Sequence, residues 1–261
     1  EIDMLGGLMG RTADISGLQY KVLNKSKGRS VWSPRAQVDK RTYEKNISNY
    51  IFNQKNTDFI KGEVISVNVK NNRVVSVVLR GGNTIKAKAI IITCGTFLSG
   101  VIHIGDRKIP AGRMGEPRSE GITENLIALG FKTMRLKTGT PPRVLRSSIN
   151  WSILEKEYGD KEPVPFSHFT KNFSPQNEAC YTIRTNDRCH NEINKNIHKS
   201  PMFTGEIEAI GPRYCPSIED KIKRFSKQPS HLLFLEPEWK NSDQIYINGF
   251  STSLPEEVQH R

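Results

Sequence analysis

The chain has 261 residues, 36% of them hydrophobic, and its 39 Lys and Arg residues against 27 Asp and Glu give a net charge of +12. This length allows one large domain or two small ones with a sizeable core. No run approaches the 18 apolar residues of a membrane span, and no secretory leader is recognisable, so we expect neither. Four cysteines are too few for a disulfide scaffold, which predicts reduced thiols in a cytoplasm.

The excess of positive charge suggests a polyanionic partner, although a lysine-rich surface in contact with solvent gives the same composition. Basic residues gather in four loops, several of them with Tyr or Trp nearby: residues 29–35, 107–118, 135–143 and 221–224. Basic loops with aromatic rings suit a nucleic-acid surface, and they also suit the phosphates of a dinucleotide. Spacing alone does not separate these two alternatives.

The first clear element after the glycine-rich start is a helix. Ala36, Val38, Tyr43 and Ile47 recur at roughly helical intervals with charges between them. This pattern predicts a helix over residues 35–56.

Three runs rich in Val and Ile follow between residues 59 and 93. The turn residues Asn71 and Asn72 separate the first two, which predicts antiparallel strands of a meander. The third run ends in four apolar residues at 89–92, which predicts a strand buried on both faces, as in a parallel sheet. A meander and a buried strand that ends in a small-residue turn are common in flavin-binding proteins with two dinucleotide-binding domains.

The middle of the chain predicts a helix, a shaped loop and an insertion. A helix is expected over residues 119–130, with Ser119 as a suitable cap and Gly130 as a suitable end. Residues 135–143 contain two prolines and cannot be helical. The polar, irregular stretch 144–200 is typical of an inserted subdomain.

Cys215 is the sharpest candidate nucleophile in the sequence. Arg213 lies two residues before it, and Ser217 is a good cap for a helix that begins directly after it. Both features lower the pKa of a thiol and favour the thiolate. The alternative is a small buried apolar residue, the commoner fate of a free cysteine. Cys180 has Arg184 nearby and is a second, weaker candidate.

No metal site is predicted. Cys189, His190 and His198 invite a zinc site, but their spacing together with Cys180 matches no usual finger or ribbon. The histidines form no HExxH pattern, so metal-dependent hydrolysis has no support.

Several strings resemble a known family. GPRYCPSIEDK at 211–221 matches, residue for residue, the signature of the MnmG (GidA) family of flavoenzymes, which modify the wobble uridine of tRNA. Other strings follow in the family's order: LNKSKGRSVWSPRAQVDKRTY at 23–43, TCGTFLSGVIHIG at 93–105, GRMGEPRS, RLKTGTPPR, CYTIRTN, FLEPE and NGFSTSLPEEVQ. The resemblance covers essentially the whole chain. Two local departures are Arg29, where the family has Pro, and Trp239, where it usually has Gly.

The resemblance implies an α/β fold. The expected architecture is an FAD-binding Rossmann-like sheet of the two-dinucleotide-binding-domain class, with an antiparallel meander and an irregular α+β insertion. It divides the chain into a partial FAD-binding domain at 1–144, an inserted subdomain at 145–210, and a segment at 211–261. This last segment binds nicotinamide and returns to the FAD-binding domain.

The resemblance also implies a reaction. The family binds FAD, reduces it with NADH and takes a one-carbon unit from methylenetetrahydrofolate. With a GTPase partner of the MnmE type, it adds an aminomethyl or carboxymethylaminomethyl group to C5 of the wobble uridine. A homodimer in the full-length protein, a tRNA substrate, a cytoplasmic location and no membrane association are implied as well.

The family's site residues fall on definite positions here. Two cysteines implicated in catalysis correspond to Cys180 and Cys215, and the division of roles between them stays open. Val64 and Ser119 fall where the family contacts FAD. The segment that would help bind the nicotinamide cofactor consists of Gly211, Pro212, Arg213, Tyr214, Cys215, Pro216, Ser217, Ile218, Glu219, Asp220, Lys221, Ile222, Lys223, Arg224 and Phe225.

Against the family pattern, this sequence is expected to be an internal fragment. It contains no GxGxxG loop to hold the FAD pyrophosphate, and it stops before the family's C-terminal region. One alternative is a folate- and FAD-dependent tRNA uracil-5-methyltransferase. Another, from a different class, is a non-catalytic RNA-binding remnant.

Overall fold

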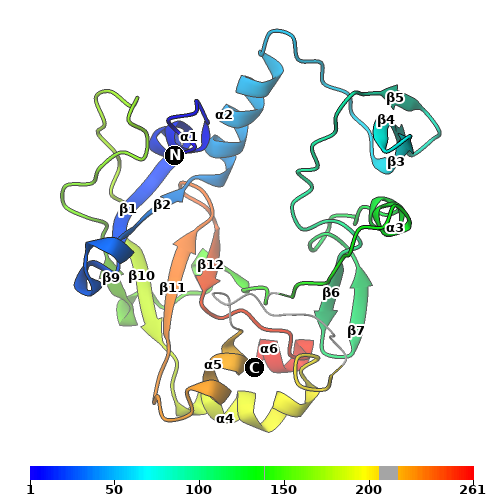
Figure 1. Ribbon diagram of the computed structural model, residues 1–261. Helices are drawn as coiled ribbons and strands as arrows, with labels where there is room; N and C mark the ends of the chain where they lie inside the picture. Colours follow the sequence, from blue (N-terminus) through cyan, green and yellow to red (C-terminus); the bar gives the residue numbers. More distant parts are fainter. Residues whose placement is uncertain (138, 206–216) are drawn as a thin grey trace. The chain divides into compact units, whose positions relative to one another are not determined.

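The computed structural model describes residues 1–137, 139–205 and 217–261, which fall into two compact units (Figure 1). Unit 1 comprises Glu1–Phe59, Pro141–Asp187 and Lys227–Ser251. Unit 2 comprises Ile60–Thr140, Arg188–Ser226 and Thr252–Arg261. Each unit is therefore assembled from three separate stretches of sequence. The three-part division at 144 and 210 stays a prediction about domain organisation.

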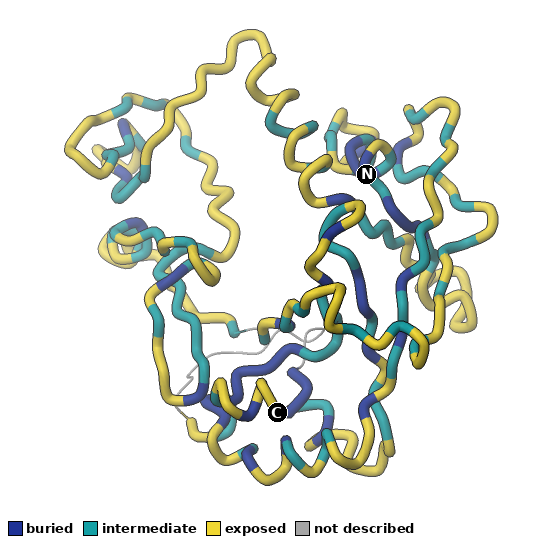
Figure 2. Tube along the Cα trace, turned by 180° about the vertical axis from the view of Figure 1, so that it is seen from behind, coloured by how far each residue is buried: buried dark blue, intermediate teal, exposed yellow. Residues whose placement is uncertain are grey.

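Unit 1 is built on a five-stranded antiparallel sheet with the order β8-β12-β11-β10-β9. Its strands are β8 (Arg143–Leu145), β12 (Gln244–Asn248), β11 (Leu232–Pro237), β10 (Cys180–Arg184) and β9 (Glu155–Glu157). Leu233, Leu235 and Ile245 are almost fully buried and supply much of its core. Buried residues concentrate on these central strands and exposed residues on the loops (Figure 2).

A hairpin and two helices complete the regular structure of unit 1. The strands β1 (Gly17–Leu23) and β2 (Ser33–Val38) pair antiparallel, and the helices are α1 (Met9–Ser16) and α2 (Lys40–Phe52). The expected helix at 35–56 is therefore confirmed only from Lys40. Residues 35–38 instead pair with β1, and the Asp39 carboxylate accepts a hydrogen bond from the Thr42 amide at 2.9 Å, which starts the helix. Short 3₁₀ turns are η1 (Lys25–Lys27), η2 (Arg29–Val31), η3 (Arg146–Ser148) and η4 (Trp151–Ile153).

The predicted meander is confirmed in unit 2. Strands β3 (Val64–Lys70), β4 (Arg73–Leu79) and β5 (Thr84–Lys86) form a three-stranded antiparallel sheet. Asn71 and Asn72 have φ angles of 51° and 57°. Two successive left-handed residues form the tight turn that fits the twist of paired strands, as the Asn-Asn sequence predicts.

The predicted parallel strand at 89–92 is wrong. Residues 89–92 lie in no strand, and Ile91 is 87% exposed and Ile92 44% exposed. Among the described residues no strand pairs with them, and an apolar run becomes a buried strand only where neighbours supply hydrogen bonds and cover both faces. The α/β fold class itself is confirmed, but every sheet pairing among the described strands is antiparallel.

The helix expected within 119–130 is α3 (Ile122–Ala128), which packs on β3. Gly130 ends it with φ of +90°, as predicted. Ser119 does not cap it, since Gly121 occupies the cap position and its amide donates to the Glu124 carboxylate at 2.9 Å. Ser119 instead forms a parallel bridge with Leu98.

The remaining elements of unit 2 are short. They are the hairpin β6 (Val101–Ile104) and β7 (Arg107–Pro110), most of α4 (Asp187–Asn196), the 3₁₀ turn η5 (Ile197–Lys199), α5 (Ile218–Arg224) and α6 (Glu256–His260). Residues 135–137 and 139–143 contain no helix, as the prolines predict; Thr140 forms an isolated bridge with Thr252, and β8 begins at Arg143. None of the described helices is long and apolar enough to cross a membrane.

Candidate functional site

The predicted site residues are distributed over both units and one segment that is not described. Cys180 lies in unit 1. Val64, Ser119 and residues 217–225 lie in unit 2. Cys215 and the rest of the segment 211–216 lie outside the described residues.

Cys180 is the first residue of β10 and is 3% exposed. Its Sγ donates a hydrogen bond to Oε1 of Gln37 on β2, with the two atoms 2.7 Å apart. The Gln37 amide nitrogen donates in turn to the carbonyl of Pro237 at 3.1 Å. The thiol therefore joins the β1–β2 hairpin to the five-stranded sheet.

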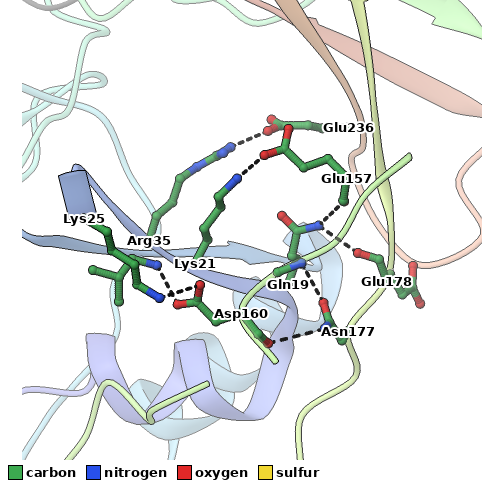
Figure 3. Close-up of polar contacts among 11 residues, drawn as sticks. Gln19, Lys21, Lys25, Arg35, Glu157, Asp160, Asn177, Glu178 and Glu236 are labelled. Carbon is green, nitrogen blue, oxygen red and sulfur yellow. Dashed lines mark hydrogen bonds and ion pairs between the residues drawn. The ribbon is translucent and has the colours of Figure 1, made fainter. Parts of the chain in front are cut away.

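The electrostatic surroundings of Cys180 favour the neutral thiol. Burial raises the pKa of the thiol to about 12, and the nearby carboxylate of Glu236 acts in the same direction. Arg35 opposes this effect, but its guanidinium is already paired with Glu236 (Figure 3). Cys180 is consequently protonated at neutral pH. This environment is the opposite of the electropositive one that makes a thiol a nucleophile.

A network of polar contacts surrounds the same hairpin (Figure 3). The Gln19 amide donates to the backbone carbonyls of Glu157 and Glu178, each at 2.9 Å. The ammonium group of Lys25 lies 2.8 Å from the carboxylate of Asp160. Burial acts to raise the pKa of Asp160, but the hydrogen bond from Lys25 and the amide of Val22 hold it below its usual value. These contacts fix the hairpin on strand β9 and the segment before β10.

A pocket of about 230 Å³ lies in unit 1, on the other face of β10 from Cys180. It is lined by Arg146, Trp151, Glu178, Ala179, Tyr181, Leu235, Pro237 and Ile245. Ala179 and Tyr181 flank Cys180 in sequence, and alternate residues of a strand face opposite sides of its sheet. Cys180 therefore does not contribute its thiol to this pocket.

Val64 and Ser119 lie close together in unit 2. Glu63 precedes Val64 and Glu120 follows Ser119 in the sequence. The carboxylate of Glu63 accepts a hydrogen bond from the Glu120 amide at 3.2 Å, which joins the two segments. At Gly121, φ is +97° and a Cβ would lie 2.8 Å from the carbonyl oxygen of Ile65, so glycine permits this close approach. The hydroxyl of Ser119 has no hydrogen-bond partner among the described residues. Their assignment as FAD contacts stays a prediction.

The described part of the predicted nicotinamide segment forms helix α5. Ser217 caps it, as predicted, by accepting a hydrogen bond from the Asp220 amide at 3.2 Å. Glu219 is fully buried, and its Oε1 accepts from the Thr252 hydroxyl at 2.8 Å and from the Ser253 amide at 3.0 Å. Its Oε2 has no partner among the described residues. The sequence did not predict this contact, because Glu219 and Thr252 lie 33 residues apart.

No group of metal ligands occurs among the described residues, where no three His, Cys, Asp or Glu side chains lie close enough to hold an ion. Cys94 is exposed and Cys189 is half-buried.

Comparison with known proteins decides the family. The model of the family described as glucose inhibited division protein A (GIDA) matches residues 1–261, the entire chain. The chain belongs to the GidA family. The resemblance inferred from the GPRYCPSIEDK string and its companions is thereby confirmed.

Curated relatives of the GidA chain carry the name tRNA uridine 5-carboxymethylaminomethyl modification enzyme MnmG. Those from Chlorobaculum tepidum and Helicobacter pylori are 46% and 49% identical to it over 261 residues. The solved structure of Aquifex aeolicus GidA in its form I crystal superposes with a TM-score of 0.91 at 46% identity, over 99% of this chain and 44% of that one. The fold is thus that of GidA, and the relatives are named as enzymes.

The matches to these two curated relatives cover 99% and 100% of this chain but only 42% of the length of each relative. This agrees with the expectation of a fragment of a longer protein.

Proposed function

We propose that the chain forms part of a tRNA-modifying flavoenzyme that adds a carboxymethylaminomethyl or aminomethyl group to C5 of the wobble uridine. The observation that carries this proposal is the family match over the whole chain, together with relatives named for uridine modification. NADH as reductant, methylenetetrahydrofolate as one-carbon donor, a GTPase partner, a homodimer and a cytoplasmic location belong to the same proposal.

Several residues fit the expected cofactors. Val64 and Ser119 lie close together, and the Ser119 hydroxyl is available to bind FAD. The buried Oε2 of Glu219 lacks a partner among the described residues, and a ribose hydroxyl of the nicotinamide dinucleotide is a donor that would satisfy it. When bound, FAD would supply the reduction–oxidation chemistry that uses NADH. The protein's own contribution is to bind these groups and to activate the uracil ring.

The buried environment of Cys180 and the sequence around Cys215 support a division of their roles. C5 of a uracil is a weak nucleophile, and a thiolate that adds to C6 turns C5 into an enolate-like carbon able to attack an electrophilic methylene. Loss of the C5 proton then allows the thiolate to leave. We assign this nucleophilic role to Cys215, on the strength of Arg213 and the following helix. Cys180 keeps its proton at neutral pH, so its role is that of a thiol that donates to Gln37.

The test uses a chimera in which this chain replaces the matching segment of a complete bacterial MnmG. Expressed in a strain that lacks its own enzyme, the chimera is expected to restore the C5 substituent at the wobble uridine, measured by mass spectrometry of tRNA nucleosides. Cys215→Ser should abolish the modification while tRNA binding persists.

Two outcomes would contradict the proposal. The appearance of 5-methyluridine in the T-loop would indicate the uracil-5-methyltransferase. A chimera that binds tRNA without flavin and without any modification would indicate a non-catalytic RNA-binding protein.

A further inference from the structure

The loop of the β1–β2 hairpin is exposed and basic. We call residues 24–32 the hairpin tip; all of them are exposed, and they form the turns η1 and η2. From Gly17 to Val38 the hairpin contains no Asp or Glu. Its cations are Lys21, Lys25, Lys27, Arg29 and Arg35. The hairpin is therefore a uniformly basic element.

Three of these cations are neutralised where the hairpin meets the rest of unit 1. Lys21 pairs with Glu157, Lys25 with Asp160, and Arg35 with Glu236 (Figure 3). Lys27 and Arg29 make no ion pair with any described residue. The ion pairs thus fix the hairpin, while two charges at its tip remain available to a partner.

The tip also presents an aromatic ring. Trp32 is 42% exposed, and its indole nitrogen donates to the Lys25 carbonyl at 3.2 Å. The guanidinium of Arg29 lies 5.7 Å from the ring centroid. The hydrogen bond fixes the orientation of the ring without burying it. A fixed, exposed ring next to Arg29, in a tip that also carries Lys27, is an arrangement that stacks on a nucleobase and holds its phosphates.

The other basic loops differ from the hairpin tip. Their arginines are mostly paired with carboxylates inside the same unit: Arg107 with Glu256, Arg113 with Glu116, Arg118 with Glu120, Arg143 with Glu238 and Arg224 with Asp220. An arginine with a carboxylate partner must exchange that partner for a phosphate, which reduces the gain on binding. Arg135 and Lys137 also make no ion pair with a described residue, so it is the combination of such cations with the exposed, hydrogen-bonded ring of Trp32 that singles out the hairpin tip.

We propose that the hairpin tip binds a single-stranded loop of RNA, with Trp32 stacking on an unpaired base and Lys27 and Arg29 contacting the flanking phosphates. This inference rests on the proposed function and specifies a surface for the tRNA substrate. An unpaired loop fits better than a duplex, because the bases of a duplex are already stacked and their faces are not accessible.

The experiment measures binding of a fluorescently labelled anticodon stem-loop to the whole chain by anisotropy. Trp32→Ala should raise the Kd about tenfold or more, whereas Trp32→Phe, which keeps a ring, should retain most of the affinity. Lys27→Ala combined with Arg29→Ala should weaken binding. The same double variant should reduce the slope of log Kd against log salt by about 1.4, because each phosphate that is no longer neutralised accounts for about 0.7.

A matched control exists on the β3–β4 hairpin. Lys70 and Arg73 flank the β3–β4 turn, are exposed, and make no ion pair with the described residues. Lys70→Ala combined with Arg73→Ala removes the same charge from a tip without an aromatic ring. The double variant should change the Kd less than twofold. Circular dichroism and thermal melting would establish that each variant is folded.

The outcomes separate this inference from the proposed function. Wild-type binding that Trp32→Ala leaves unchanged would overturn the inference alone, as would equal affinity for a fully paired hairpin of the same length. Loss of binding in the tip variants, combined with a chimera that restores no wobble modification, would support the inference and overturn the proposed function. Absence of RNA binding by the wild-type chain would overturn the inference and the assignment of a tRNA substrate.

Discussion

At the scale of single residues, the environment of a cysteine matters more than its place in a motif. Cys180 follows a polar stretch and precedes Tyr181, and its string resembles one of the family's segments. Tertiary contacts bury it to 3% exposure and raise its pKa to about 12. A thiol with that pKa supplies almost no thiolate at pH 7. The candidate nucleophile is accordingly Cys215.

Alkylation rates test this distinction. With iodoacetamide at pH 7, Cys180 should react at least about tenfold more slowly than the exposed Cys94, because it is buried and protonated. Cys215, if it is a thiolate, should react faster than Cys94 and Cys189. Peptide mass spectrometry after short labelling times measures all four sites in one sample.

The control for this measurement is the same labelling in urea, where the four rates should converge. Folded-state labelling of Cys180 as fast as that of Cys94 would contradict its burial. Equal rates at all four cysteines would remove the argument for a low-pKa Cys215.

At the scale of elements, short-range signals place turns and caps, and close backbone contacts hold the elements together. Asn71 and Asn72 form the β3–β4 turn, and Ser217 caps α5. Gly121 serves a different purpose, since it brings the start of α3 against the backbone of β3 at Ile65. The proximity of Val64 and Ser119 depends on this contact.

A pair of glycine substitutions separates backbone strain from this close contact. Gly121 and Gly130 have similar φ values of +97° and +90°, but a Cβ at Gly130 would meet no atom within 4 Å. Gly130→Ala should therefore lower the free energy of unfolding by about 1 kcal/mol, the cost of the left-handed conformation alone. Gly121→Ala should cost more, about 3 kcal/mol, because the Ile65 carbonyl must also move.

Urea denaturation measures both free energies of unfolding. Equal losses in the two variants would show that the approach of Gly121 to Ile65 contributes nothing. A larger loss in Gly130→Ala than in Gly121→Ala would contradict the geometry of the α3 cap.

At the scale of the whole molecule, the net charge of +12 sets the expected response to salt. Lys21, Lys25 and Arg35 are paired with carboxylates. This pairing leaves the net charge of the chain unchanged, but it determines which cations are available to a partner. Long-range attraction to a polyanion depends on the total charge, whereas short-range phosphate contacts depend on the unpaired cations.

Binding of complete tRNA should therefore weaken steeply with salt. If about six phosphates are contacted, the affinity should fall about a thousandfold between 50 and 200 mM monovalent salt. Filter binding over a salt series measures the slope. Cys215→Ser is the control, because loss of a thiol should leave the slope unchanged. A Kd independent of salt would contradict an electrostatic interface.

The sequence by itself determined the family, the meander, the Asn71-Asn72 turn, the cap at Ser217 and the excess of positive charge. These features depend on local backbone preferences, on composition or on strings that can be compared directly. Local pattern was not sufficient at residues 89–92, where the apolar run predicted a buried strand but no described strand pairs with it.

Only the tertiary structure decided that Cys180 is a buried thiol and that Glu219 accepts from Thr252 and Ser253. The same holds for Lys27 and Arg29, which make no ion pair with the part of the chain that the structure describes. Each of these facts depends on partners distant in sequence; Cys180 and Gln37, for example, lie 143 residues apart. Burial and neighbouring charge change the pKa of a thiol and the availability of a cation. Both effects are set by what surrounds a side chain in space, which no local pattern in the sequence specifies.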